Sequence, residues 1–126
     1  MIVGIGIDIV ETARIRDMFQ RHGRRMLNRI LTEAEQKYVL SHADPTQRIA
    51  GRWVAKEAAL KALGTGLSQG IRWKDLEILP DTNGKPILTF AGEAKKISDR
   101  LKTSVIHISI THVESMAMGQ VILEAL

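Results

Sequence analysis

Apolar residues alternate with other residues at the start of the chain, which predicts a β-strand over residues 2–9. One face of this strand carries four apolar residues, Val3, Ile5, Ile7 and Ile9. The opposite face carries two glycines and an aspartate, Gly4, Gly6 and Asp8. Two glycines on one strand face indicate that another backbone or a ligand approaches closely there.

From Thr12 the apolar spacing changes to that of a helix, with Ile15, Phe19 and Met26 on one side. The neighbouring side carries three arginines and a methionine, Arg14, Met18, Arg21 and Arg25. We expect one continuous helix here. It must accommodate Gly23, at a cost of about 1 kcal/mol relative to alanine.

Two capping motifs predict the helices that follow. Thr32-Glu33-Ala34-Glu35 matches a capping box and begins a short helix that ends near Ser41. Asp44-Pro45-Thr46-Gln47 supplies an N-cap, a proline at the first helical position and a glutamine at the third. This second helix is predicted to end near Leu63, with Gly64 as a left-handed cap.

The second half of the chain carries mostly strand patterns. Strands are predicted over 76–79 and 87–90, around the turn at 81–86, and a polar helix is predicted over 92–102. A hairpin is predicted from 105–112 and 116–123. Early helices and late strands predict an α+β fold, with residues 1–126 forming a single domain whose antiparallel sheet packs against helices.

Composition narrows the class of protein. The 126 residues are 44% hydrophobic, contain no cysteine and hold no apolar run of the ~20 residues that a membrane-spanning helix needs. The N-terminus lacks a basic segment and reaches Asp8 early, unlike a signal peptide. We therefore expect a cytoplasmic protein with no membrane partner, no disulfide and no thiolate metal site.

The net charge of +4 is concentrated in one segment. Residues 12–31 hold six arginines and one aspartate, or +5, so the remaining residues sum to −1. Such a patch is either a solvated helix face or a docking surface for an acidic partner. Arginine suits carboxylates and phosphates equally, so an acidic protein and a nucleic acid both fit.

The segment around Trp53 carries candidate chemistry. A helical projection places Glu57 and Lys61 inside an apolar stripe that includes Ala50, Trp53 and Val54. A carboxylate on the packed side of a helix needs a compensating charge or hydrogen bonds. The alternative is an ordinary surface pair of Glu57 and Lys61, but its apolar surroundings favour a functional role.

Asp8 is the second unusual carboxylate, because strand interiors are poor in aspartate. Its simplest interpretation is a capping residue ahead of the next helix. Together with Glu57 it could bind a hard cation such as Mg²⁺, which takes one or two carboxylates plus water and substrate phosphates. Arg52, Lys56 and Lys61 could then offset phosphate charge. His112, at a strand end, is more often structural, and His22 carries no signal.

These motifs resemble those of holo-[acyl-carrier-protein] synthases, in the 4′-phosphopantetheinyl transferase family. The matching segments cover nearly the whole chain, in order: Gly4-Ile5-Gly6-Ile7-Asp8-Ile9, Arg52-Trp53-x-x-Lys56-Glu57-Ala58-x-x-Lys61-Ala62, Gly64-Thr65-Gly66, Asn83-Gly84-Lys85-Pro86 and Ser109-Ile110-Thr111-His112. The main departure is Trp53, where phenylalanine is commoner.

The resemblance implies transfer of 4′-phosphopantetheine from coenzyme A to a serine of apo-acyl carrier protein, which supports fatty acid biosynthesis and releases adenosine 3′,5′-bisphosphate. It implies that Asp8 and Glu57 bind Mg²⁺ on the pyrophosphate and that Lys61 lies against the same phosphates as a third catalytic residue. The nucleotide end of coenzyme A would contact Arg52, Gly84, Lys85, Pro86 and His112. The family is a homotrimer with active sites between subunits.

The residues fit this reaction at two points. Displacement at phosphorus gains from positioning and charge neutralisation, which two carboxylates, a metal ion and several cations supply. Acyl carrier proteins are acidic, and the predicted face of Arg14, Met18, Arg21 and Arg25 is cationic with an apolar anchor. The acceptor of the serine proton could be Glu57, a metal-bound water or another carboxylate.

The competing class is a non-catalytic RNA- or nucleotide-binding module, suggested by the arginine cluster. Aromatic residues make up only 4% of the chain, so stacking platforms for single strands are scarce. No RRM or KH signature, P-loop, zincin motif or nucleophile elbow is present. A bare scaffold protein would leave Glu57 unexplained, and we expect no nucleic-acid partner.

Overall fold

A long strand lying against a long helix forms the centre of the molecule. In the computed structural model, which describes residues 1–126, β1 (Ile2–Glu11) pairs antiparallel with β5 (Met116–Glu124). β5 in turn pairs with β4 (Val105–His112), so the sheet order is β1-β5-β4. The register places Asp8 opposite Gly119.

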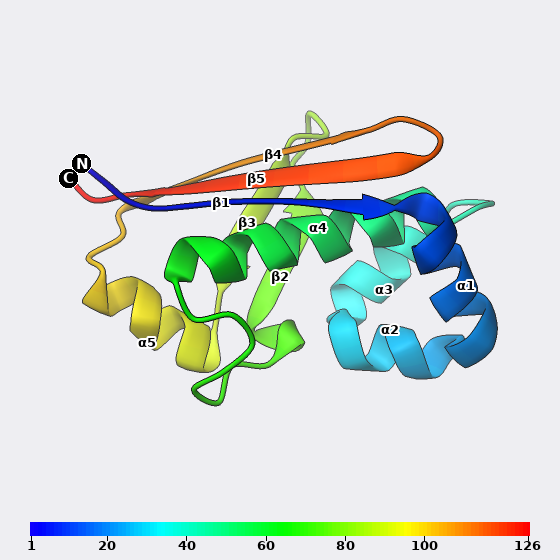
Figure 1. The fold of residues 1–126 in the computed structure, drawn as a ribbon, viewed down its shortest axis with the longest axis horizontal. Coiled ribbons are helices and arrows are strands. Elements are labelled where there is room, and N and C mark those ends of the chain that lie inside the picture. Colours follow the sequence, from blue (N-terminus) through cyan, green and yellow to red (C-terminus); the bar gives the residue numbers. More distant parts are fainter.

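The 18-residue helix α4 (Thr46–Leu63) packs against the inner face of this sheet (Figure 1). At one end lie three short helices, α1 (Thr12–His22), α2 (Arg24–Ile30) and α3 (Glu33–Leu40). α5 (Gly92–Arg100) lies toward the other end, near the single-turn helix η1 (Trp73–Asp75). A separate hairpin is formed by β2 (Leu76–Pro80) and β3 (Pro86–Phe90). No helix combines the length and hydrophobicity needed to cross a bilayer.

The predicted α+β class is confirmed, and so are the predicted strands and the late hairpin, although the strands form two sheets. The predicted capping box is present, but the second motif is shifted by one residue, because Pro45 and not Asp44 is the N-cap of α4. Thr32 and Glu35 form a reciprocal capping box at α3, and Asp44 Oδ1 accepts from the Thr46 N–H at 3.1 Å at the start of α4. Gly64 ends α4 with a left-handed φ of 79°.

The prediction of one continuous helix across Gly23 is wrong. Gly23 adopts φ 53° and ψ −129° and separates α1 from α2. This backbone conformation is disfavoured for residues with a Cβ but open to glycine. The change of direction lets Met26, Leu27 and Ile30 of α2 enter the core. Arg25 therefore lies on α2 and does not continue the α1 face of Arg14, Met18 and Arg21.

The glycines of β1 face the backbone of α4, as the sequence predicted. A Cβ built on Gly6 would lie 1.8 Å from the Ala58 carbonyl oxygen, and one on Gly4 would lie 2.1 Å from that of Ala62. No real Cβ atom approaches a backbone oxygen so closely. This tight contact sets the distance between β1 and α4. Asp8 lies two residues after Gly6 on the same face of β1, so its side chain also points toward α4.

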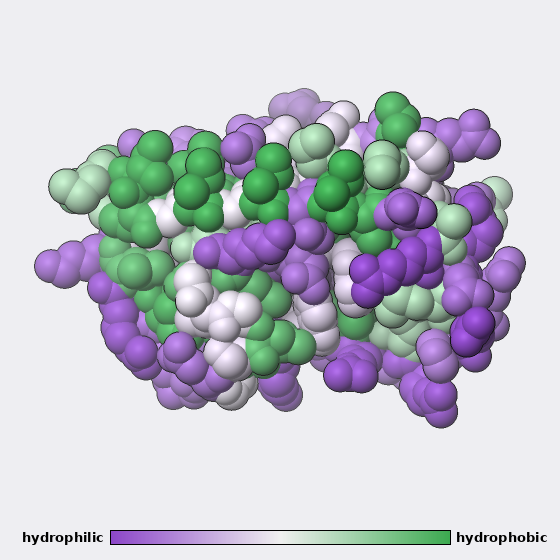
Figure 2. All heavy atoms as spheres, viewed as in Figure 1, coloured by the Kyte–Doolittle hydropathy of each residue, from purple (hydrophilic) through white to green (hydrophobic).

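The outer face of the three-stranded sheet is uncovered, and it is apolar along β1, while its β4 side carries His107, Ser109 and Thr111. It carries Ile5, Ile7, Ile9, Met116 and Met118, of which the three isoleucines are each more than half exposed. Figure 2 shows hydrophobic side chains following the part of the molecule where β1 and β5 lie. Monomeric proteins rarely leave such a continuous patch in water.

Candidate active site

Asp8, Glu57 and Lys61 form the first component of the site, here called the carboxylate site. Lys61 Nζ donates to Asp8 Oδ1 at 3.2 Å and to the Ile7 carbonyl oxygen at 2.9 Å. Burial raises the pKa of Glu57, and the negative charge of Asp8 raises it further, while Lys61 and Arg14 act in the opposite direction. The two carboxylates are thus close enough to repel each other, and a cation between them would relieve that repulsion.

The predicted position of Glu57 on the packed side of its helix is wrong. α4 is buried on nearly every side, and the line of Trp53, Glu57 and Lys61 is its least buried line. The alternative of an ordinary surface pair between Glu57 and Lys61 is not found, because Lys61 bonds to Asp8 instead. A helical projection failed here because small and apolar residues surround the whole helix, so the sequence shows no distinct polar face.

Lys56 cannot approach a bound phosphate, contrary to the expectation from the sequence. Its side chain is 1% exposed, and Nζ donates to Glu35 Oε1 and the Ile30 carbonyl oxygen, each at 2.7 Å, and to the Trp73 carbonyl oxygen at 3.2 Å. Desolvation lowers the pKa of Lys56, and the Glu35 carboxylate opposes that effect. The sequence identified Glu35 only as a capping residue and missed this buried partner.

A second component, the His112 pocket, has a volume of about 200 Å³. Its lining includes four of the five residues expected to contact the nucleotide, Arg52, Gly84, Pro86 and His112. The sequence missed the other lining residues, Tyr38, Gln47, Arg48, Gly51, Pro80 and Ile110. Lys85 belongs to the same turn but does not line the pocket, and its N–H donates to Asp81 Oδ1 at 2.9 Å.

Arg52 is held firmly in the wall of this pocket. Its Nε donates to the Ile78 carbonyl oxygen at 3.2 Å, and its guanidinium lies 4.4 Å from the centroid of the Tyr38 ring. Burial lowers the pKa of Arg52, but arginine remains charged at neutral pH. The pocket therefore carries a fixed positive charge beside an aromatic ring.

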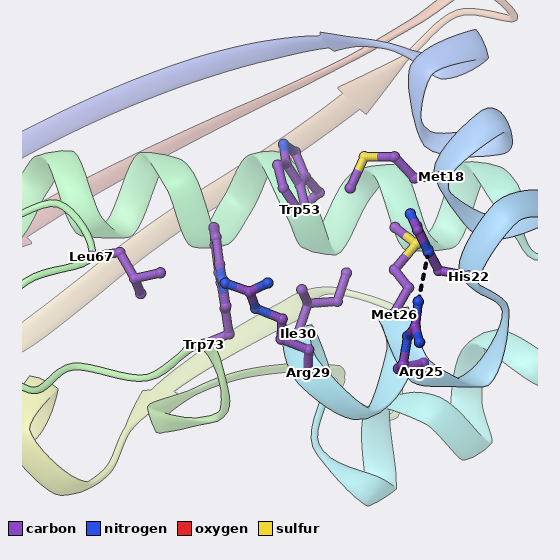
Figure 3. A pocket seen from close by; sticks show the side chains of 9 residues that line it. All are labelled: Met18, His22, Arg25, Met26, Arg29, Ile30, Trp53, Leu67 and Trp73. Carbon is purple, nitrogen blue, oxygen red and sulfur yellow. Dashed lines mark hydrogen bonds between the residues drawn. The ribbon is translucent and has the colours of Figure 1, made fainter.

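The third component, the Trp53 pocket, has a volume of about 580 Å³ between α1, α2 and α4 (Figure 3). It is lined by Met18, His22, Arg25, Met26, Arg29, Ile30, Trp53, Leu67 and Trp73. Trp53 and Trp73 stack at 5.1 Å, and Arg14 lies 5.6 Å from the Trp53 ring. The pocket has an apolar floor and a basic rim.

Two of the four residues expected to bind the partner, Met18 and Arg25, line this pocket, and Arg14 borders it. Arg21 does not line it and pairs with Asp17 at 3.1 Å. His22 carried no signal in the sequence, yet it lines the pocket, and its Nδ1 accepts a hydrogen bond from the Arg25 guanidinium at 3.2 Å. Helical spacing could not reveal Leu67 and Trp73, which reach the pocket from a loop and from η1.

Neither pocket contains the carboxylate site. The His112 pocket and the Trp53 pocket are lined by neither Asp8 nor Glu57, although Arg52, Trp53 and Glu57 are all on α4. Residues 52 and 57 point about 140° apart around a helix of 3.6 residues per turn. One chain therefore presents separate parts of a site on different faces.

Comparison with known proteins gives the class to which this fold belongs, the 4′-phosphopantetheinyl transferases. Residues 4–117 match the model of the 4′-phosphopantetheinyl transferase superfamily, and the chain belongs to this superfamily. A holo-[acyl-carrier-protein] synthase of Koribacter versatilis is 45% identical over 124 residues, which cover 98% of this chain and 99% of the relative.

Solved structures agree with the sequence relatives. The chain is similar to a holo-(acyl-carrier-protein) synthase from Bacillus anthracis in complex with CoA (3′,5′-ADP), with 38% identity, a TM-score of 0.84, and coverage of 100% and 99%. It is also similar to the holo-[acyl-carrier-protein] synthase of Neisseria meningitidis, with 33% identity, a TM-score of 0.89, and coverage of 98% and 99%.

Proposed function

We propose that this chain is a holo-[acyl-carrier-protein] synthase that supports fatty acid biosynthesis, with residues 1–126 forming one transferase domain. In this reaction the carrier's serine oxygen forms a bond to the phosphorus next to pantetheine. The phosphoanhydride bond of coenzyme A breaks, adenosine 3′,5′-bisphosphate leaves and the serine proton is released. The observation that carries the proposal is the carboxylate site, in which Asp8 is paired with Lys61, one helical turn beyond Glu57 on α4.

The donor set of the carboxylate site fits Mg²⁺. Asp8 and Glu57 would hold the ion, and the chain has no cluster of three or more acidic, histidine or cysteine side chains that could hold a metal without help. Mg²⁺ commonly takes one or two carboxylates and fills its other positions with water and substrate phosphates. When bound, it neutralises charge on those phosphates. Lys61, which already donates to Asp8, supplies a second positive charge beside them.

The His112 pocket would receive the nucleotide end of coenzyme A. Its fixed Arg52 charge suits a phosphate, and Gly84, with a left-handed φ of 83°, forms the turn that leads to Pro86 in the pocket wall. The Bacillus anthracis relative was solved in complex with CoA (3′,5′-ADP), which supports coenzyme A as a ligand of this chain.

The Trp53 pocket would receive the acyl carrier protein. Its apolar floor can take an apolar side chain, while Arg25 and Arg29 at the rim can pair with carboxylates of an acidic partner. Arg14 and Arg21, outside the lining, would extend the positive field that guides the carrier.

A homotrimer with shared active sites would join these parts. The carboxylate site and the His112 pocket lie on different faces of one chain, so one coenzyme A can contact both only if a neighbouring copy contributes one of them. The exposed isoleucines Ile5, Ile7 and Ile9 supply an apolar surface that a second copy would cover.

The decisive experiment incubates the chain with coenzyme A, Mg²⁺ and a folded apo-acyl carrier protein and weighs the carrier by mass spectrometry. We expect the mass of one phosphopantetheine on the carrier, no adduct when coenzyme A or Mg²⁺ is withheld, and none with Glu57→Gln. If the native chain modifies no apo-carrier protein under these conditions, the proposed function is wrong.

A further inference from the structure

An ion pair lies fully buried at the centre of the molecule and takes no part in the chemistry proposed above. Lys56 Nζ and Glu35 Oε1 are 2.7 Å apart, and the two side chains are 1% and 0% exposed. Replacing such a pair by apolar residues often leaves a protein equally stable or more stable. Stability alone is therefore a weak reason for this chain to carry it.

One set of contacts of this pair leads to the Trp53 pocket. Lys56 Nζ also donates to the carbonyl oxygens of Ile30, at 2.7 Å, and Trp73, at 3.2 Å. Both residues line the Trp53 pocket, and Trp73 stacks on Trp53. Lys56 thus fixes two separate segments, the end of α2 and η1, where they form the pocket wall.

The other set of contacts leads to the His112 pocket. Glu35 Oε2 accepts from the Ile78 N–H at 2.9 Å, and the carbonyl oxygen of the same Ile78 accepts from Arg52 Nε at 3.2 Å. Arg52 lines the His112 pocket. Glu35 thus fixes the β2 backbone that holds the guanidinium in place.

We propose that Lys56 and Glu35 are positioning residues for the transfer reaction. Lys56 positions the wall that meets the carrier, and Glu35 positions Arg52 for the nucleotide end of coenzyme A. This inference rests on the proposed function of the two pockets. The two members of the pair have different roles, because each has its own backbone contacts. Lys56 acts on the binding of the carrier, and Glu35 acts on the binding of coenzyme A.

Two single variants separate the two sets of contacts. Lys56→Met removes the donor to Ile30 and Trp73, and we expect the KM for carrier to rise about tenfold while the KM for coenzyme A stays native. Glu35→Gln keeps an oxygen for Lys56 but places an amide NH₂, which cannot accept, against the Ile78 N–H. This variant is expected to raise the KM for coenzyme A about tenfold and to leave the KM for carrier native.

A spectroscopic readout tests the Lys56 contacts without any activity. The chain contains two tryptophans, and both belong to the stacked pair Trp53–Trp73. Their coupled circular dichroism signal therefore reports on this pair. We expect Lys56→Met to alter that signal and Glu35→Gln to preserve it. Lys95→Met on α5, which removes an exposed pair with Asp99, is the control and should change neither KM nor the signal.

The outcomes decide the proposal in each case. The double variant Lys56→Met/Glu35→Gln avoids leaving one charge buried alone and should show both KM increases. KM values that rise together in each single variant, or that stay native, would overturn the proposal. Failure of all three variants to fold would assign the pair to stability alone and overturn it too. If the native chain is inactive, the proposed function fails, while the tryptophan signal and calorimetric coenzyme A binding still test both sets of contacts.

Discussion

Glu57 shows how one residue can serve binding at the expense of stability. Burial and the neighbouring charge of Asp8 both raise its pKa, so at neutral pH the folded chain holds an ionised group in a site that disfavours its charge. A bound cation would remove this disadvantage. Residues placed in this way are typical of functional sites, because nothing in the unliganded fold benefits from them.

Glu57→Gln is predicted to be inactive and slightly more stable than the native chain at neutral pH. Loss of the carboxylate should lower kcat/KM about 100-fold or more, because charge neutralisation at the phosphates depends on it. Because the folded pKa lies above the usual 4.5, ionisation destabilises the folded state at neutral pH, and this cost disappears as the pH falls below 4.5.

The stability gain should be about 0.5 kcal/mol at pH 7, since solvent screens a partly exposed charge. Urea unfolding of both proteins at pH 7 and pH 4 measures it, and the difference should shrink at pH 4. A destabilised Glu57→Gln at pH 7 would show that the carboxylate supports the fold.

At the scale of elements, the contact of β1 with α4 places Asp8 beside Lys61. Gly6→Ala forces a Cβ to within 1.8 Å of the Ala58 carbonyl oxygen, so the strand must move away from the helix. We expect a loss of about 3 kcal/mol in unfolding free energy and weaker Mg²⁺-dependent activity.

The matched control for Gly6→Ala is Gly51→Ala, in the interior of α4. A Cβ at Gly51 would lie 3.4 Å from Ile110 Cγ2, an ordinary contact, and alanine favours the helix by up to about 1 kcal/mol. In thermal unfolding, Gly6→Ala should therefore be less stable than the native chain and Gly51→Ala equally stable or more stable. Equal stability of Gly6→Ala and the native chain would show that the tight approach does not constrain β1.

The basic rim of the Trp53 pocket belongs to the same scale, because the helix α2 supplies its arginines, Arg25 and Arg29. Arg25→Glu, at the rim of the Trp53 pocket, is predicted to raise the KM for carrier about tenfold and to leave the KM for coenzyme A unchanged. Lys102→Glu, an exposed charge reversal beyond α5, is the control for net charge. Steady-state kinetics should show that the difference in KM for carrier between Arg25→Glu and the native chain becomes smaller at high salt, because salt screens the charges at the rim. An equal effect of both variants would assign the loss to net charge.

Local signals in the sequence were enough to predict most elements. The capping box at Thr32 and the left-handed Gly64 depend on neighbouring residues, and both are present. The start of α4 is displaced by one residue, with Pro45 as the N-cap, although Asp44 still accepts from the Thr46 N–H. Gly23 shows where local signals are insufficient. A glycine destabilises a helix only slightly, so the sequence alone does not predict a break, and the helix ends at Gly23 because α2 packs its own apolar residues into the core.

The candidate site was predictable only in part, because it depends on contacts between residues that are far apart in the chain. Glu57 and Asp8 stood out as unusual carboxylates, but their surroundings depend on how β1 meets α4. The sequence suggested that Lys56 binds phosphate, because it could not show that Lys56 is buried against Glu35. These two residues are 21 positions apart in the chain, and only the fold brings them together. Trp73 joins the Trp53 pocket from beyond a glycine-containing loop, and no spacing rule connects the two.

The outer sheet face governs behaviour at the scale of the whole molecule. Ile7 lies in the middle of β1 and is 53% exposed in the isolated chain. Ile7→Lys places a charge in the face that a neighbouring copy would cover, which is costly in an apolar interface. We expect this variant to be folded but monomeric by light scattering, and inactive. A monomeric and fully active Ile7→Lys would show that one chain holds a complete site.

The proposed sharing of active sites between the subunits of a homotrimer makes a further prediction about mixed assemblies. Asp8→Asn disables the carboxylate site and His112→Ala disables the His112 pocket, so each homotrimer should be inactive. In coexpressed mixed trimers, some interfaces combine an intact Asp8 from one subunit with an intact His112 from its neighbour. Random assembly makes this combination at about a quarter of the interfaces, so about a quarter of native activity should return. Mixing the two purified proteins without subunit exchange is the control and should stay inactive. Coexpressed subunits that assemble together yet remain inactive would mean that Asp8 and His112 act within the same chain, because only sites divided between subunits can be restored by exchange.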